Sequence, residues 1–166
     1  MSAVAPVNLK FVSSDNKEFL IPANIIKMSN TVKDMLVGLG LDTLETTNAD
    51  AIPLQNVDGK TLEKVIVWCK HHLEHPAPAP AAPVENKELS PFATDFFKVS
   101  QTEVFELILA ANFLDIDDLL DAGCKTIADS MKGLSPQELR DKFEIVGDFT
   151  AEEQEEVSND NKWASK

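Results

Sequence analysis

The sequence of 166 residues lacks several features that would point to particular functions. Its six glycines are scattered and form neither a GxGxxG motif nor a GxxxxGKS/T motif, so both of these phosphate-binding loops are missing. No apolar run is long enough to cross a bilayer, and no positively charged segment leads into an apolar one at the start. We therefore expect neither membrane insertion nor secretion.

Positive charge is scarce. The chain has 15 Lys and Arg residues against 28 Asp and Glu residues, a formal net charge of −13. This excess would repel phosphate, so we expect no nucleic acid and no anionic membrane as a partner, but basic or apolar proteins. The apolar content of 43% is ordinary, and a chain of this length buries roughly 70% of its unfolded surface. One domain with an appendage is the expectation.

Cysteine is rare as well. Cys69 and Cys124 both lie in apolar helical patterns, which is typical of reduced thiols in an intracellular protein. Their number alone leaves a disulfide between them open. We interpret Cys124 as a buried and inert thiol rather than as a nucleophile. The expected location of the protein is the cytoplasm and the nucleus.

The residues that could bind a metal ion gather in one place, where Cys69 is followed by His71, His72 and His75. Structural zinc sites usually take their ligands from two separated pairs, and the dipole of a helix C-terminus favours histidine without any metal. We therefore predict no metal and no other cofactor. Acidic pairs such as Asp117-Asp118 complement the dipole of a first helical turn. No enzyme is expected.

The first half of the chain predicts a mixture of strands and helices. Alternating apolar residues predict a strand at 7–11, a turn at 13–17 and a second strand at 19–21, which Pro22 ends because it has no N–H. The further expected elements are helices that contain residues 25–28 and 32–39, a loop at 41–51, an extended piece at 52–54, and a helix that begins after Asp58 and ends at His71-His72.

A Pro/Ala-rich segment at about 75–91 separates the two halves, and its alternating prolines predict an extended connection. Its flanks are too small to fold alone, so we interpret it as an insertion within one domain. The chain beyond it is nearly all helical. The expected elements there are helices at 92–97, 104–113 and 116–131, a stop at Gly133, and two helix starts marked by capping boxes, Ser135 with Glu138 and Thr150 with Glu153.

The run from Val104 to Met131 is the most informative one. Between Val104 and Phe113 only Glu106 and Asn112 are polar, so this helix must be covered almost all round by its own domain or by a partner. The polar helices after residue 133 also carry scattered apolar residues. Their spacing leaves two possibilities open, that they pack on the preceding domain or that they pack against a partner. These apolar residues are Leu139, Phe143, Ile145, Val146, Phe149, Val157 and Trp163.

The chain contains, in this order, the blocks SSDNKEF, TVKDML, VIVWCKHH, ENKE, FELILAANFLDI, DLLD, CKTIA, MKG, SPQELRDKF and DFTAEEQEEV, followed by a late tryptophan. These blocks resemble the Skp family, the adaptor subunits of SCF (Skp–cullin–F-box) ubiquitin ligases. The resemblance implies an α/β (α+β) fold, with a BTB/POZ-type domain at 1–132 and a mostly helical F-box-binding extension at 133–166. It also implies a non-catalytic adaptor that links an F-box substrate receptor to a cullin scaffold.

Carried over position by position, the resemblance places Asn112 and Phe113 at the cullin and eight residues at the F-box protein. Tyrosine is usual at the second cullin position, so Phe113 lacks a hydroxyl whose hydrogen bond would contribute about 0.5–1.5 kcal/mol. Trp163 is the strongest candidate anchor, because tryptophan is enriched among the residues that dominate interfaces. The eight residues are Phe105, Leu120, Cys124, Ile127, Leu139, Phe143, Ile145 and Trp163.

Three departures from the family pattern indicate a divergent paralogue. Asp117-Asp118 replaces a common Lys-Gly pair, Thr102-Glu103 replaces Gly-Thr, and the linker is rich in Pro and Ala instead of acidic residues. Two alternatives follow. The protein could keep its F-box surface with weakened or lost cullin binding, or it could be a structural module that forms a homodimer through its BTB/POZ domain.

Overall fold

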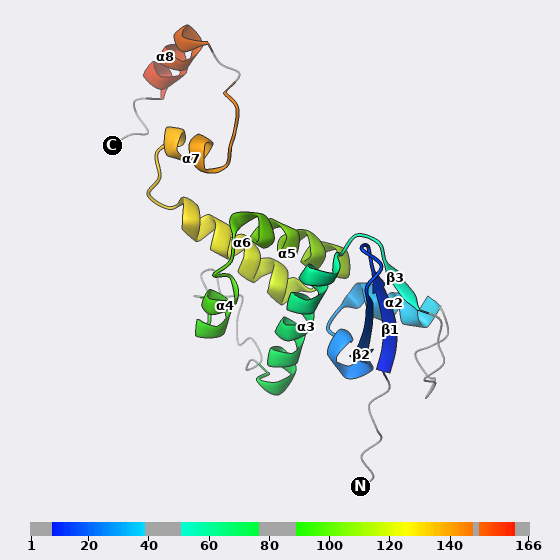
Figure 1. The fold of residues 1–166 in the computed structure, drawn as a ribbon. Coiled ribbons are helices and arrows are strands. Elements are labelled where there is room, and N and C mark those ends of the chain that lie inside the picture. The colour runs from blue at the N-terminus through cyan, green and yellow to red at the C-terminus, as the bar shows by residue number, and fades with distance from the viewer. Residues whose placement is uncertain (1–7, 39–50, 77–88, 148–149, 162–166) are drawn as a thin grey trace. The chain divides into compact units, whose positions relative to one another are not determined.

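A computed structural model describes residues 8–38, 51–76, 89–147 and 150–161 of the chain. The chain divides into two compact units, Met1–Asp129 and Ser130–Lys166, and each is described by itself (Figure 1). The first unit combines a small sheet with helices, which confirms the predicted mixed fold. The functional division at 132/133 stays a prediction. Most of the predicted 41–51 loop and residues 77–88 of the predicted insertion lie outside the described residues.

In the part of the first unit that the structure describes, the sheet has three strands in the order β2-β1-β3. β1 (Asn8–Ser13) pairs antiparallel with β2 (Glu18–Pro22), and β1 pairs parallel with β3 (Ile52–Leu54). The predicted hairpin and the extended piece are thus confirmed. The inward-facing side chains of all three strands are buried, as the alternating pattern requires: Leu9, Phe11, Ile21, Ile52 and Leu54.

Among the described residues of the first unit, six helices begin. They are α1 (Ala23–Ile26), α2 (Asn30–Gly38), α3 (Gly59–Glu74), α4 (Pro91–Phe96), α5 (Gln101–Leu114) and α6 (Asp117–Met131). Figure 1 shows α3 beside α5, next to the sheet. α3 continues beyond the predicted end at His71-His72. No helix among the described residues combines the length and the apolar character that crossing a bilayer requires.

Local capping signals account for several of the helix starts. The carboxylate of Asp58 accepts a hydrogen bond of 2.7 Å from the N–H of Thr61, which confirms the predicted cap of α3. Ser100 and Glu103 form a reciprocal capping box at the start of α5, which the sequence analysis missed. Glu103 also pairs with Lys60 of α3, so this start is tied to the neighbouring helix.

The two flanks of the Pro/Ala-rich segment lie in the first compact unit, where α4 packs against the C-terminal half of α3. The ring of Trp68 on α3 contacts the ring of Phe96 edge-on at 5.0 Å between centroids, and it also contacts Phe92 and Phe97. Aromatic pairs at such distances add to the stabilisation that burial gives. Trp68 and Phe97 are buried within the continuous hydrophobic core of the unit.

The second unit confirms both predicted capping boxes. Ser135 caps α7 (Pro136–Lys142) with Glu138, and Thr150 caps α8 (Ala151–Asp160) with Glu153. α7 has no buried residue. The apolar residues Ile145, Val146 and Val157 are exposed. The described part of this unit therefore has little core of its own.

Candidate partner-binding site

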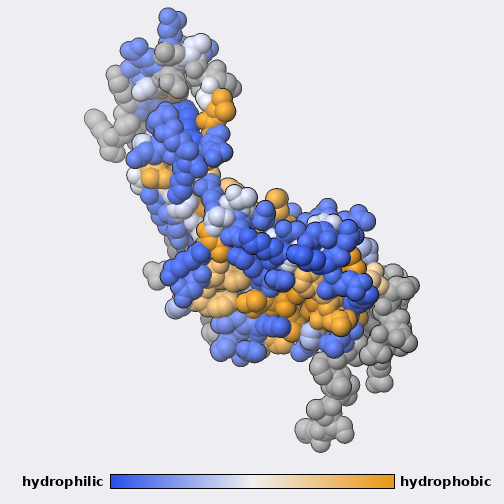
Figure 2. Space-filling model, viewed as in Figure 1, coloured by the Kyte–Doolittle hydropathy of each residue, from blue (hydrophilic) through white to orange (hydrophobic). Residues whose placement is uncertain are grey.

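Helix α5 is covered by its own domain on only part of its surface. Five of its apolar residues are buried, namely Val104, Leu107, Ala110, Ala111 and Leu114. Phe105 and Leu109 are 40% and 68% exposed, and Asn112 follows them at helical spacing on the same face. We call Phe105, Leu109 and Asn112 the α5 stripe. Figure 2 shows one face of the first unit, on which apolar patches lie among hydrophilic side chains.

The C-terminal end of α5 carries the two residues that the resemblance assigns to the cullin. Asn112 is exposed and Phe113 is half-buried against the core. Asp115 then ends the helix in the left-handed conformation, with φ of 51°. The exposed Asp117 and Asp118 follow directly as the first turn of α6. Phe113 and this acidic pair therefore lie next to each other along the chain.

The same helix end is held by the start of α2. Thr31 Oγ1 donates a hydrogen bond of 2.8 Å to the carbonyl of Phe113, and Ser29 Oγ donates to the carbonyl of Leu114. The N–H of Asn30 donates to the carbonyl of Asp115 at 3.3 Å. We call Ser29, Asn30 and Thr31 the α2 clamp. It satisfies carbonyls that a helix end leaves without intrahelical partners.

The residues of α6 that the resemblance assigns to the F-box protein share one helix face. Leu120, Cys124 and Ile127 are spaced by four and three residues. Leu120 and Ile127 are half-buried against the core, but Cys124 is exposed. The predicted burial of Cys124 is therefore wrong. Gly123, the residue before Cys124, is buried instead, and the thiol of Cys124 lies at the surface.

Gly123 marks a close approach between α6 and α5. A Cβ atom added at this glycine would lie 2.6 Å from Cγ1 of Ile108. That separation is far below a van der Waals contact, so α6 can pack this closely only because residue 123 has no side chain. Ile108 lies one helical turn after Phe105 on α5. This contact holds α6 closely against α5, the helix that carries the α5 stripe.

The second unit contains the remaining described F-box candidates. Leu139 and Phe143 are half-buried, and Ile145 is 56% exposed. Lys142 Nζ lies 6.0 Å from the centroid of the Phe143 ring, at the limit of a cation–π contact. Trp163 lies outside the described residues. The assignment of all eight F-box residues and of the two cullin residues stays a prediction.

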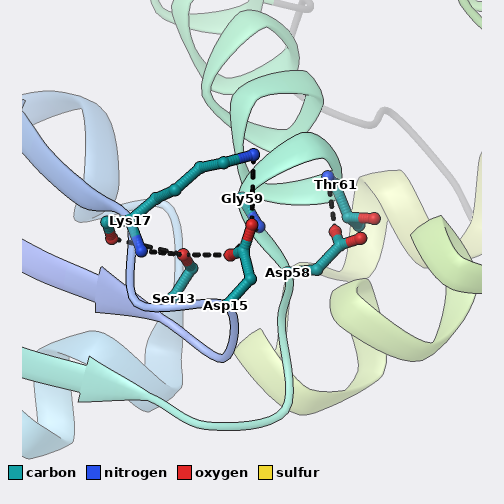
Figure 3. A network of polar contacts seen from close by, with 6 residues as sticks. All are labelled: Ser13, Asp15, Lys17, Asp58, Gly59 and Thr61. Atoms are coloured by element: carbon teal, nitrogen blue, oxygen red, sulfur yellow. Dashed lines mark hydrogen bonds and ion pairs between the residues drawn. The ribbon is translucent and has the colours of Figure 1, made fainter.

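A polar network at the β1–β2 turn, which the sequence analysis missed, joins the sheet to α3 (Figure 3). Asp15 Oδ1 accepts hydrogen bonds of 2.6 Å from Ser13 Oγ and 2.8 Å from the N–H of Gly59, and its other oxygen pairs with Lys17 Nζ at 3.1 Å. Hydrogen bonds from Ser13 and Lys17, with that of Gly59, lower the pKa of Asp15 to about 2. The network is structural support for the start of α3.

A shallow depression of about 250 Å³ lies between this turn, the start of α3 and α5. Leu109 and Glu106 line it from α5, and Asp58 and Thr61 line it from α3. The floor is closed by the buried Val57. Its mixture of one exposed apolar side chain with two carboxylates fits a protein surface better than a small ligand, because small-molecule pockets enclose most of their ligand.

The histidines at the end of α3 are part of an aromatic stack. The ring of His71 lies parallel to that of Phe92 at 3.5 Å between centroids and stacks on His75 at 4.7 Å. Burial, followed by the neighbouring His75 and His72, lowers the pKa of His71. The described residues include no group of three or more His, Cys, Asp or Glu side chains that could hold a metal ion. Cys69 is buried beneath them, and burial raises its pKa to about 12.

Comparisons with known proteins match both parts of the chain. Residues 8–74 match the model of the Skp1 family tetramerisation domain, and residues 117–164 match that of the Skp1 family dimerisation domain. The chain is 48% identical over 160 residues to a Skp1-related protein of Caenorhabditis elegans, covering 93% of this chain and 90% of that protein.

Two further relatives are similar over almost their whole length. The SCF ubiquitin ligase complex protein SKP1b of Dictyostelium discoideum is 45% identical over 159 residues, which cover 93% of this chain and 94% of that protein. The E3 ubiquitin ligase complex SCF subunit sconC of Arthroderma otae is 40% identical over 168 residues, covering 99% and 98%. The similarity thus runs through both units of the structure.

Proposed function

This chain belongs to the Skp1 family, and on that premise we propose that it is a non-catalytic adaptor of an SCF E3 ubiquitin ligase, which links an F-box substrate receptor to a cullin scaffold. The observation that carries the proposal is its similarity, over 93% or more of the chain, to proteins named as subunits of SCF complexes. The BTB/POZ-type domain inferred from the resemblance matches the family model over residues 8–74.

The F-box side of the proposal is supported by uncovered apolar surface. Phe105 on α5 and Ile145 after α7 are both exposed, and Leu120 and Ile127 are only half-buried. Burial of a fully exposed side chain of this kind contributes about 1.5–3 kcal/mol, so each of these partly exposed residues would add a fraction of that if a partner covered it. Such side chains would contact apolar residues of an F-box domain, and polar residues next to them would form the rim of the contact.

The cullin side is assigned to Asn112 and Phe113 at the C-terminal end of α5. Asn112 offers an exposed side-chain amide beside the half-buried ring of Phe113, an arrangement that can both hydrogen-bond and pack against a partner helix. A net charge of −13 for the chain favours a partner with basic residues at the contact. As part of the same proposal, the protein acts in the cytoplasm and the nucleus.

Binding measurements with purified proteins test the proposal. The full chain is titrated with an F-box domain and, separately, with a cullin N-terminal domain. We expect Ile145→Asp to weaken F-box binding at least tenfold, because a charge would enter an apolar contact. Val67→Asp on α3 is the matched control, since Val67 is 52% exposed and lies outside the assigned residues. If the parent chain binds neither partner, the proposal is wrong.

A second function, self-association, is favoured by the names of the two family models, which are a tetramerisation and a dimerisation domain. A structural module of this kind would form homodimers through its BTB/POZ-type domain, without an F-box protein. Analytical ultracentrifugation across a wide concentration range distinguishes the two functions. A chain that stays monomeric at the highest concentration would remove self-association and leave the adaptor function untouched.

A further inference from the structure

The α2 clamp is a feature that the assigned binding residues do not include. Three consecutive residues at the start of α2, Ser29, Asn30 and Thr31, donate hydrogen bonds to three consecutive carbonyls, those of Phe113, Leu114 and Asp115. The donors and acceptors lie 82 and 85 residues apart in the two side-chain bonds. The end of α5 is therefore held by the start of α2 in addition to its own C-cap, where the N–H groups of Asp115 and Ile116 donate to the carbonyls of Asn112 and Ala111.

The three bonds of the clamp differ in what surrounds them. Ser29 is fully buried, and its Oγ also accepts a bond of 3.1 Å from the N–H of Val32, so Ser29 belongs to the core of the unit. Thr31 is half-buried, and its bond to the carbonyl of Phe113 is only part-buried. Thr31 is thus the member of the clamp that acts directly on an assigned cullin residue at the edge of the core.

We infer that Thr31 is a positioning residue for the cullin edge, which holds the Asn112–Phe113 end of α5 in the conformation that the cullin binds. This inference rests on the proposed function, and it adds a residue that acts through the carbonyl of Phe113. The carbonyl of Phe113 lies in the last turn of α5, where it has no partner within the helix. Without the hydroxyl of Thr31, the helix end frays more often.

The size of the effect follows from the population of the held conformation. If only a fraction of the molecules presents Asn112 and Phe113 correctly, the apparent affinity falls by that fraction. The loss is limited by the net contribution of one hydrogen bond, which corresponds to a roughly two- to tenfold change in the dissociation constant. The F-box candidates on α6 lie beyond the end of α5. The affinity of the chain for an F-box domain should therefore stay unchanged.

Four proteins test the inference by isothermal titration calorimetry, each with a cullin N-terminal domain and with an F-box domain. Thr31→Val removes the hydroxyl and keeps the shape, and it should weaken cullin binding roughly two- to tenfold without changing F-box affinity. Thr31→Ser keeps the donor and should bind the cullin like the parent. Thr94→Val is the matched control. It removes the hydroxyl of a threonine in α4, which donates to the carbonyl of the preceding N-cap residue Ser90.

The outcomes separate the inference from the proposed function. Unchanged cullin affinity of Thr31→Val overturns the inference while the adaptor function stands, and so does an equal loss for both partners, which would indicate a general structural role. If Thr31→Val does not fold, the decision rests on Thr31→Ser, and reduced cullin affinity of that variant overturns the inference. A parent chain that binds no cullin at all overturns the cullin half of the proposed function itself.

Discussion

The carboxylate of Asp15 accepts a hydrogen bond from the N–H of Gly59, 44 residues further along the chain, at 2.8 Å. This bond joins the turn of the first hairpin to the first residue of α3, where a side chain could be added only if its neighbours moved. A Cβ atom there would lie 2.6 Å from Cδ of Lys17. The hairpin and α3 therefore have one fixed relative position.

Asp15→Asn should lower the stability of the chain, because the amide cannot replace a charged acceptor of these bonds. The folded-state pKa of about 2 lies below the ordinary 3.8, so the charged form stabilises the fold above pH 3.8, and this contribution is lost as the pH falls from 3.8 to about 2. Urea unfolding of parent and variant should differ at pH 7 and converge at pH 2. Asp34→Asn, at an exposed position of α2, is the control, and a difference that persists at pH 2 would contradict this explanation.

Gly123→Ala should destabilise the first unit by about 1–3 kcal/mol, the usual cost of forcing extra volume into a packed contact. The new methyl group would meet Ile108 at 2.6 Å. Thermal and urea unfolding measure the loss, and adding Ile108→Ala should recover part of it. Gly38→Ala is the matched control, because a Cβ atom at that helical position meets nothing within 4 Å. Equal effects of the two alanines would show that the close approach is unimportant.

The two cysteines should differ sharply in reactivity. Cys124 is exposed, whereas Cys69 is buried and its pKa is raised to about 12, so only Cys124 should react with an aromatic disulfide reagent in the native protein. The expected result is one thiol per chain before denaturation and two after it. Cys124→Ser should abolish the native reaction, and a fast reaction that survives in this variant would contradict the burial of Cys69.

Acidification should loosen the contact between α3 and α4. The pKa of His71 is lowered in the fold by burial and by the neighbouring histidines. As the pH falls, His71 is therefore protonated in the unfolded chain before it is protonated in the folded one. The contribution of neutral His71 to stability is fully present above pH 6.5 and declines as the pH falls below that value. Chemical unfolding between pH 8 and pH 5 measures this decline. His71→Phe should flatten it, because phenylalanine can stack on Phe92 without titrating.

Phe113→Tyr should strengthen cullin binding by about 0.5–1.5 kcal/mol, or roughly two- to tenfold, if the hydroxyl usual at this position makes one hydrogen bond to the cullin. Calorimetry with a cullin N-terminal domain measures the change, and F-box affinity serves as the internal control. Unchanged cullin affinity would refute the idea that Phe113 weakens this contact, and would leave Asp117 and Asp118 as the departures to test next.

Much of the fold could be predicted because its signals are local. A capping box needs residues only three apart, so Ser135 and Thr150 were identified as helix starts, and the alternation around Leu9 and Phe11 predicted the hairpin. The family was identified from short ordered blocks and is confirmed by the comparisons.

Exposure and long-range contacts could not be predicted. Periodicity identified an apolar face on α6, but whether the protein covers Cys124 depends on how closely Gly123 approaches Ile108. The same holds for Leu109, which is 68% exposed within the most apolar segment of the chain. A sequence pattern identifies which side of a helix is apolar, and it does not identify which neighbour covers that side.

The sequence by itself determined the order of the elements, several of the helix starts, and the family to which the chain belongs, because these depend on neighbouring residues and on blocks in order. Only the tertiary structure decided that Asp15 supports Gly59 and that Thr31 holds the carbonyl of Phe113. Such bonds form between groups that are far apart in the chain. Their geometry exists only after the intervening strands and helices have packed into one core.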